Sequence, residues 1–124
     1  MKRLVWGFVA VTTVLAVGIF TLAYALVPRI SVTLVNKTGA QLQNVTLQYT
    51  GGQVVLGPIE PDGVARAKIR VSGESSIRVT HLDTKGVKHE SDAGLYIESG
   101  YRGSVTIDVT PSGAVVRSQQ IKSY

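Results

Sequence analysis

An uncharged apolar run near the N-terminus constrains this chain more strongly than any other feature. Residues 4–27 contain no charged side chain, and Lys2 and Arg3 precede them. A hydrocarbon core about 30 Å thick is crossed by roughly 20 apolar residues of helix, so this run is long enough to span a bilayer. It has no polar face at helical spacing, which argues against a buried helix of a soluble protein. We therefore predict a transmembrane helix over residues 4–27.

The residues around this run predict its orientation. Residues 1–3 should stay in the cytoplasm, because short basic segments remain on that side of the membrane. The chain would then be an N-in, single-pass protein of the inner or plasma membrane, with its C-terminal part in the periplasm or outside the cell. A secretory signal cleaved after Ala25 is the alternative, since residues 23–25 have the small-x-small form of a cleavage site. The length of the run favours an uncleaved signal anchor.

Composition limits what the exported part can do. The chain has 13 basic and 8 acidic residues; without Lys2 and Arg3, 11 basic and 8 acidic residues remain, a net charge of +3. This bias is too small for a nucleic-acid-binding protein, so no nucleic acid is expected as a partner. The absence of cysteine excludes disulfides, cysteine catalysis and thiolate metal sites. No motif for a cofactor is found, and none is expected.

Alternating apolar and polar residues predict a β-rich domain over residues 29–118. The clearest stretch is 65–71, where Ala65, Ala67, Ile69 and Val71 alternate with three basic residues. Short stretches of this kind, separated by glycine and proline turns, predict seven to nine antiparallel strands. We expect an immunoglobulin-like or transthyretin-like β-sandwich, with a small barrel as the alternative. Residues 95–97 are expected to form a strand, and residues 119–124 a frayed polar tail.

Two histidines are the first candidate site. If residues 83–86 form a turn with Gly86 in the left-handed conformation, Asp83 pairs with Val87 and His81 faces His89 directly. Neighbouring imidazoles suit zinc or copper, but a metal site needs further ligands, for which Asp83 and Asp92 are the nearest candidates. The alternative is a pair of solvated or hydrogen-bonded histidines without a metal.

Basic and aromatic side chains form two candidate interaction surfaces. Arg66, Lys68 and Arg70 alternate along one strand and should share a face, which Arg78 on the following strand would join. Such a row suits lipid phosphates, anionic glycans or an acidic protein, although a solvated sheet face has the same pattern. Tyr101 and Arg102, placed between glycines at a hairpin tip, are residue types common in interface hot spots.

No arrangement of residues predicts catalysis. The sequence contains no assignable serine, histidine and acid triad and no phosphate-binding loop followed by a helix. We therefore predict a non-catalytic, membrane-anchored interaction or accessory module of the cell envelope with a protein partner there. A small-ligand or metal carrier that uses His81 and His89 is the alternative, and a hydrolase assembled from scattered residues is a weaker one.

Overall fold

Residues 29–123 are described by the structure, a computed structural model, and they form an all-β domain. The predicted cytoplasmic residues 1–3 and transmembrane helix 4–27 lie outside this range. Within residues 29–123 no helix is long and apolar enough to cross a membrane. The described part contains eight strands: β1 (Ile30–Asn36), β2 (Leu42–Tyr49), β3 (Gly52–Ile59), β4 (Val64–Ile69), β5 (Arg78–Leu82), β6 (Lys88–Asp92), β7 (Arg102–Thr110) and β8 (Gly113–Lys122).

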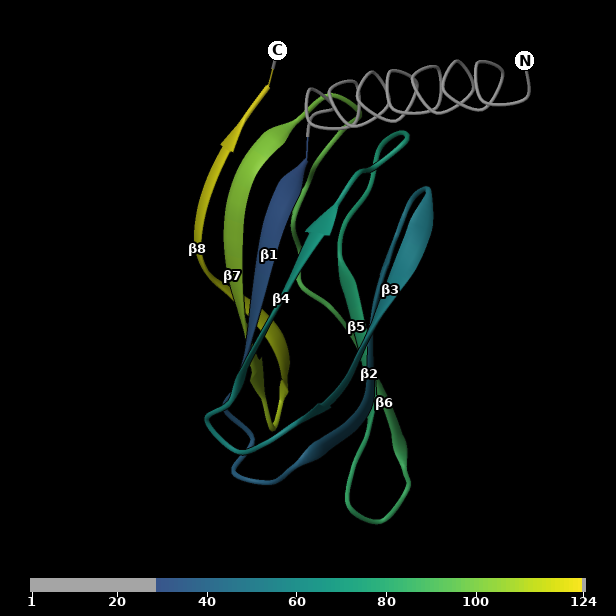
Figure 1. Cartoon of the computed structure of the whole chain (residues 1–124), viewed down its shortest axis with the longest axis vertical. Helices are drawn as coiled ribbons and strands as arrows, with labels where there is room; N and C mark the ends of the chain where they lie inside the picture. Colours follow the sequence, from purple (N-terminus) through teal and green to yellow (C-terminus); the bar gives the residue numbers. More distant parts are fainter. Residues whose placement is uncertain (1–28, 124) are drawn as a thin grey trace, which may run out of the picture.

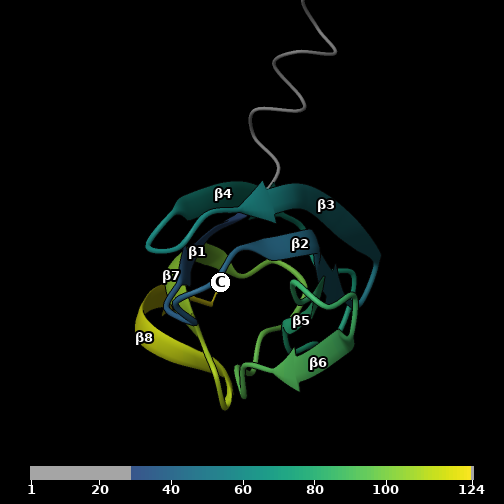
Figure 2. The ribbon, with the colours of Figure 1, turned by 90° about the horizontal axis from the view of Figure 1, so that it is seen from below.

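The eight strands form two sheets that pack face to face as a sandwich. Sheet 1 has the strand order β4-β1-β7-β8, and sheet 2 has the order β3-β2-β5-β6. Figure 2 shows the two sheets enclosing one interior, with β3 beside β4 and β6 beside β8 at the open edges. β1 and β7 start at one end of the sandwich, where β4 and β8 finish (Figure 1). We call this the entry end, because the described part of the chain begins there, at Arg29.

One strand pair departs from the predicted antiparallel pattern. β1 and β7 are parallel, with Ile30 opposite Gly103 and Leu34 opposite Ile107. Every other pair of neighbouring strands is antiparallel. Alternation along a strand shows which face is buried but does not reveal the direction of its neighbour. Because 65 residues of chain separate these two strands in the sequence, no local turn signal could predict their pairing.

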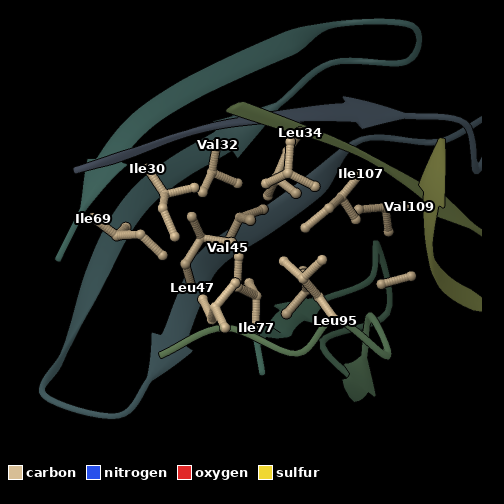
Figure 3. Packing of buried hydrophobic residues seen from close by; sticks show 14 of the residues in the cluster. Ile30, Val32, Leu34, Val45, Leu47, Ile69, Ile77, Leu95, Ile107 and Val109 are labelled. Atoms are coloured by element: carbon tan, nitrogen blue, oxygen red, sulfur yellow. The ribbon is translucent and has the colours of Figure 1, made fainter. Parts of the chain in front are cut away.

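The core lies between the sheets and consists of aliphatic side chains. Figure 3 shows Ile30, Val32 and Leu34 of β1 pointing toward Val45 and Leu47 of β2. All five side chains are buried, at intervals of two residues along each strand. This spacing confirms the alternation predicted from the sequence, because only one face of each strand is covered.

The segment between β6 and β7 differs from the predicted strand. Residues 95–97 form only an isolated antiparallel bridge, between Ile97 and Ser75, while Leu95 and Ile97 are buried in the core. This segment carries the chain from sheet 2 to sheet 1. Its apolar residues face inward as they would in a strand, but a chain that changes sheets has no neighbour to pair with along its length.

The C-terminal strand is longer than predicted. β8 continues to Lys122, so most of the expected polar tail 119–124 belongs to sheet 1, and the sandwich extends beyond the predicted boundary at residue 118. Gln119 and Gln120 pair with Val105 and Ser104 of β7. The prediction failed here because ladder hydrogen bonds come from the backbone, and polar side chains on an exposed edge strand do not weaken them.

A buried asparagine fastens the end of the sandwich opposite the entry end. Asn36 is fully buried, and its Nδ2 donates to the carbonyls of Ala40, Ile59 and Glu60 at 2.7, 3.0 and 3.1 Å. Its Oδ1 accepts hydrogen bonds from the backbone N–H and the hydroxyl of Thr38. One side chain therefore joins the loop after β1 to the end of β3, and its own buried polar atoms are all hydrogen-bonded.

Candidate functional site

The basic side chains of β4 and of Arg70, which directly follows it, lie on the outer face of sheet 1, as predicted. Arg66, Lys68 and Arg70 are exposed, whereas Ile69 is buried and Ala67 is half-buried. The register sets Lys68 opposite Ser31 and Arg66 opposite Thr33 of β1. Arg66 and Lys68 therefore lie next to the hydroxyl groups of β1, and no acidic residue of β1 is opposite them.

Charge is distributed unevenly between the two sheets. The strands of sheet 2 contain two basic and two acidic residues, whereas the strands of sheet 1 contain five basic residues and one acidic residue, Asp108. The carboxylate of Asp108 forms an ion pair with the guanidinium of Arg117, 2.6 Å away. The remaining basic residues of sheet 1 are Arg66, Lys68, Arg102 and Lys122.

Arg78 does not join the basic row, which corrects the prediction. It begins β5 in sheet 2, opposite Gln48 of β2 and Asp92 of β6. There it borders a shallow hollow of about 280 Å³ together with Tyr49. The prediction placed Arg78 next to β4 because β5 follows β4 in the sequence, but the chain changes sheets between these strands.

Tyr101 and Arg102 do not lie at a hairpin tip. Tyr101 ends the segment that crosses from β6 to β7, and its N–H donates to the carbonyl of Glu98 at 3.1 Å. Tyr101 is half-buried and packs against the core, so its ring stabilises the fold. Arg102 is exposed at the start of β7 and pairs with Lys122 of β8. The two residues therefore have different surroundings.

The histidine hairpin has the predicted register. The N–H of Asp83 donates to the carbonyl of Val87 at 3.0 Å, Gly86 adopts a φ of 78°, and His81 is directly opposite His89. The two imidazole rings are stacked, with centroids 5.1 Å apart and planes inclined by 15°. The turn at residues 83–86 thus fixes the register of the whole β5–β6 hairpin.

Asp83 organises both the turn and one of the rings. Its Oδ1 accepts hydrogen bonds from the N–H groups of Lys85 and Val87 at 2.8 and 3.0 Å, and the ring Nε2 of His89 donates to its Oδ2 at 2.9 Å. The hydrogen bond from His89, with those from the backbone, lowers the pKa of Asp83 to about 2. The carboxylate therefore stays charged down to strongly acidic pH.

His81 occupies the more buried position of the pair. Its Nδ1 is buried and has no hydrogen-bond partner among the described residues. Burial lowers the pKa of His81 below 6.5, the charge of His89 lowers it further, and the charge of Asp83 acts in the opposite direction. A neutral His81 is thus favoured, with one ring nitrogen directed away from any protein partner.

A cleft of about 330 Å³ opens beside the two histidines. Its lining includes His81, Asp83 and His89 together with Ser91 of β6 and the β7–β8 turn around Pro111. Volumes of this order hold small organic ligands. The cleft is partly closed where the N–H of Ala114 donates to the hydroxyl of Ser91 at 2.8 Å, between the edges of the two sheets.

The geometry gives limited support to a metal at this cleft. Among residues 29–123, no three histidine or acidic side chains form a group that could hold a metal ion. A metal binds in the plane of an imidazole ring, so two stacked rings direct their nitrogens side by side and not toward one point. Asp83 lies next to His89 as expected, whereas Asp92 contacts Ser76 and the N–H of Gly94 instead.

Comparisons with known proteins add information on the fold. No protein-family model matches the sequence, and no curated protein matches it. A solved structure of a protein from Eubacterium rectale is similar, with 16% identity and a TM-score of 0.51; the match covers 77% of this chain and 87% of that one. A "putative cell adhesion protein" from Bacteroides uniformis matches at 13% identity with a TM-score of 0.44, over 77% of this chain and 50% of that one. The first similarity supports the β-sandwich fold.

Proposed function

We propose that this chain is a non-catalytic, membrane-anchored module of the cell envelope that binds an acidic partner through sheet 1. The uneven charge of the two sheets supports this, because five basic residues against one acidic residue on sheet 1 favour contact with a negative surface. Residues 4–27 would anchor the chain with the N-terminus in the cytoplasm, and the sandwich would lie in the periplasm or outside the cell. The anchor would raise the effective concentration of the sandwich toward partners in the same membrane.

We also propose which of the two predicted classes of β-sandwich this domain belongs to. In an immunoglobulin constant domain the first strand pairs with the second, in a sheet of four strands that faces a sheet of three. Here β1 pairs with β4 and β7, and each sheet has four strands. This order supports the transthyretin-like alternative among the two classes that the sequence predicts.

Protease accessibility tests the location. Protease added to intact spheroplasts should digest residues 29–124, while the N-terminal end should remain attached to the membrane fraction. A sandwich that stays protected until the membrane is lysed, or that is recovered from the soluble cytosolic fraction, would contradict the proposal.

Crosslinking in cells tests the contact surface. A protein partner crosslinked to the wild type should be lost with Arg66→Glu, since this residue is exposed on the outer face of sheet 1. Lys85→Glu makes the same charge change in the β5–β6 turn and should keep the partner. Loss of the partner in both variants, or in neither, would show that sheet 1 is not the contact surface.

The cleft beside His81 favours a second candidate function, the binding of a small ligand or metal ion. Its support is the volume of the cleft together with the unpartnered Nδ1 of His81. Zinc and copper titrations, followed by the NMR signals of the two imidazole rings, test this function. Metal binding that shifts both rings and is lost with His81→Phe would support it, and the absence of saturable binding would exclude a metal carrier.

A further inference from the structure

Each of the four strands of sheet 1 has a basic residue at the entry end, either within the strand or directly next to it. Ile30 is opposite Ile69 of β4 and Gly103 of β7, and Arg102 is opposite Lys122 of β8. Arg102 and Lys122 are paired within their strands. Arg29 and Arg70 lie directly outside β1 and β4, and they reach the same level when the register is continued by one position. We call this line the entry row; in spatial order it consists of Arg70, Arg29, Arg102 and Lys122.

The entry row belongs to the outer face of the sheet. Arg70, Arg102 and Lys122 are exposed and Arg29 is half-buried. Their neighbours Ile30 and Ile69 are buried and Ile121 packs against the core, which agrees with alternation of faces along a strand. The N–H of Gly103 donates to the carbonyl of Arg29 at 3.3 Å, which fixes β1 and β7 side by side at this level. Since neighbouring strands are about 4.8 Å apart, the four backbone positions span roughly 14 Å.

Positive charge decreases along the sheet with distance from the entry row. The next outward-facing level contains one basic residue, Lys68, and the level after it contains one, Arg66. The remaining six positions of these two levels are neutral and polar: Ser31, Ser104, Gln120, Thr33, Thr106 and Ser118. The acidic residue of sheet 1, Asp108, follows only beyond them, in its ion pair with Arg117.

We propose that the entry row binds the phosphates of anionic lipid headgroups in the membrane that residues 4–27 enter. This inference rests on the proposed function, because it requires the membrane to lie next to residue 29. Electrostatic attraction to a bilayer is screened over about 8–10 Å at physiological salt, so only charges at the entry end would contribute. The density of basic residues on the outer face of sheet 1 is highest at the entry end and falls with distance from it. This distribution suits a bilayer that lies against the entry end.

Two acidic residues occupy loops at the same end and limit the net charge there. The hydroxyl of Tyr96 lies 3.0 Å from Oε1 of Glu74 and 2.5 Å from Oε1 of Glu98. These contacts hold both carboxylates at one tyrosine, outside the strands of sheet 1. The entry end therefore carries acidic as well as basic side chains, and the test must change residues of the entry row itself.

Energy transfer in lipid nanodiscs tests the proposal with the full chain. Because the protein has no cysteine, Ser118→Cys on the outer face of sheet 1 accepts a single donor dye, and Ser112→Cys in the β7–β8 turn places a control dye at the opposite end. The acceptor is a labelled lipid in discs of phosphatidylcholine, with or without phosphatidylglycerol. Transfer from position 118 should rise when phosphatidylglycerol is present and return to the phosphatidylcholine value at high salt, whereas transfer from position 112 should not rise.

Charge reversal identifies the residues responsible. Arg70→Glu combined with Lys122→Glu should abolish the gain from phosphatidylglycerol, and Lys85→Glu, at the opposite end, should retain it. Equal transfer in both lipids, or a gain that survives the double variant, would overturn the proposal. A polyanion that binds through the same residues without any lipid dependence would also overturn it and would favour an anionic glycan. A chain that does not remain with the discs would instead contradict the anchor of the proposed function.

Discussion

His81 and His89 stack across the β5–β6 hairpin, with ring centroids 5.1 Å apart and ring planes inclined by 15°. Two protonated imidazoles at this distance repel each other, and burial of His81 adds a cost to its charged form. The pKa of His81 is accordingly lowered, first by burial and then by the charge of His89. The hairpin should therefore become less stable at acidic pH, where His81 is protonated.

The first prediction concerns stability between neutral and mildly acidic pH. Below pH 6.5 the unfolded chain protonates its histidines more readily than folded His81 does, so the free energy of unfolding should fall as the pH drops through that value. The loss should level off once folded His81 is also protonated. Urea unfolding at a series of pH values from about 7.5 to about 5 measures this slope. His81→Phe, which keeps a ring but cannot be protonated, should flatten it, and an unchanged slope would assign the effect to another group.

The second prediction concerns Asp83 in strong acid. The folded pKa is about 2 and the ordinary value is 3.8, so the charged carboxylate stabilises the folded chain above pH 3.8 and loses this effect as the pH falls toward 2. Asp83→Asn keeps an oxygen that can accept from Lys85 and Val87 but has no charge for His89. Its acid unfolding should therefore be flatter than that of the wild type between about pH 4 and about pH 2, as measured by circular dichroism at fixed urea.

The part of the candidate site that depends on local geometry was predictable from the sequence. A turn of known type at residues 83–86 determines which residues of β5 and β6 face each other, so the pairing of His81 with His89 follows by counting. The alternation of apolar and basic residues in β4 likewise determines the faces of Arg66 and Lys68. In both cases the deciding interactions lie within a few residues along the chain.

The parts that depend on distant pairing were not predictable. The entry row exists because β1 and β7 are parallel neighbours and β8 pairs with β7. Nothing in the sequence near Arg29 or Lys122 indicates these pairings, so the row could not be predicted. Arg78 was misplaced for the same reason, since nothing local shows that the chain changes sheets after β4. The turn chemistry around Gly100 predicts a reversal of the chain, but it does not distinguish a hairpin from a crossing between sheets.

The third prediction tests the role of Asn36. In Asn36→Asp a carboxylate would replace the amide that donates to the carbonyls of Ala40, Ile59 and Glu60. One carboxylate oxygen would keep the N–H and hydroxyl donors of Thr38, but the oxygen in place of Nδ2 would lie against three carbonyl oxygens without a donor. This buried, repelled charge should cost at least about 3 kcal/mol of stability. Gln53→Glu makes the same amide-to-acid change at an exposed position of β3 and should shift stability by less than about 0.5 kcal/mol. Similar unfolding midpoints in urea for the two variants would show that the hydrogen bonds of the Asn36 side chain do not stabilise the fold.

The fourth prediction concerns the contact between β7 and β8 at the entry end. Gly103 has a φ of 139°, and a Cβ atom there would lie 1.9 Å from the carbonyl oxygen of Gln120 and 2.9 Å from the Cα of Ile121. Since both contacts are with backbone, no side-chain rotation relieves them, and Gly103→Ala must separate the two strands. We expect a loss of at least about 2 kcal/mol in the free energy of unfolding. Faster hydrogen exchange should accompany it at the amides of β8 near Ile121.

The matched control for this prediction is Gly73→Ala. A Cβ atom at Gly73 would meet only the methyl group of Thr50, at an ordinary contact distance of 3.7 Å, and Gly73 has no positive φ. Adding the methyl group there should change stability by less than about 1 kcal/mol, because the folded chain accommodates it without moving a strand. If Gly103→Ala were as stable as Gly73→Ala, β7 and β8 could not approach each other as closely as described. The alignment of Arg102 with Lys122 in the entry row would then lose its basis.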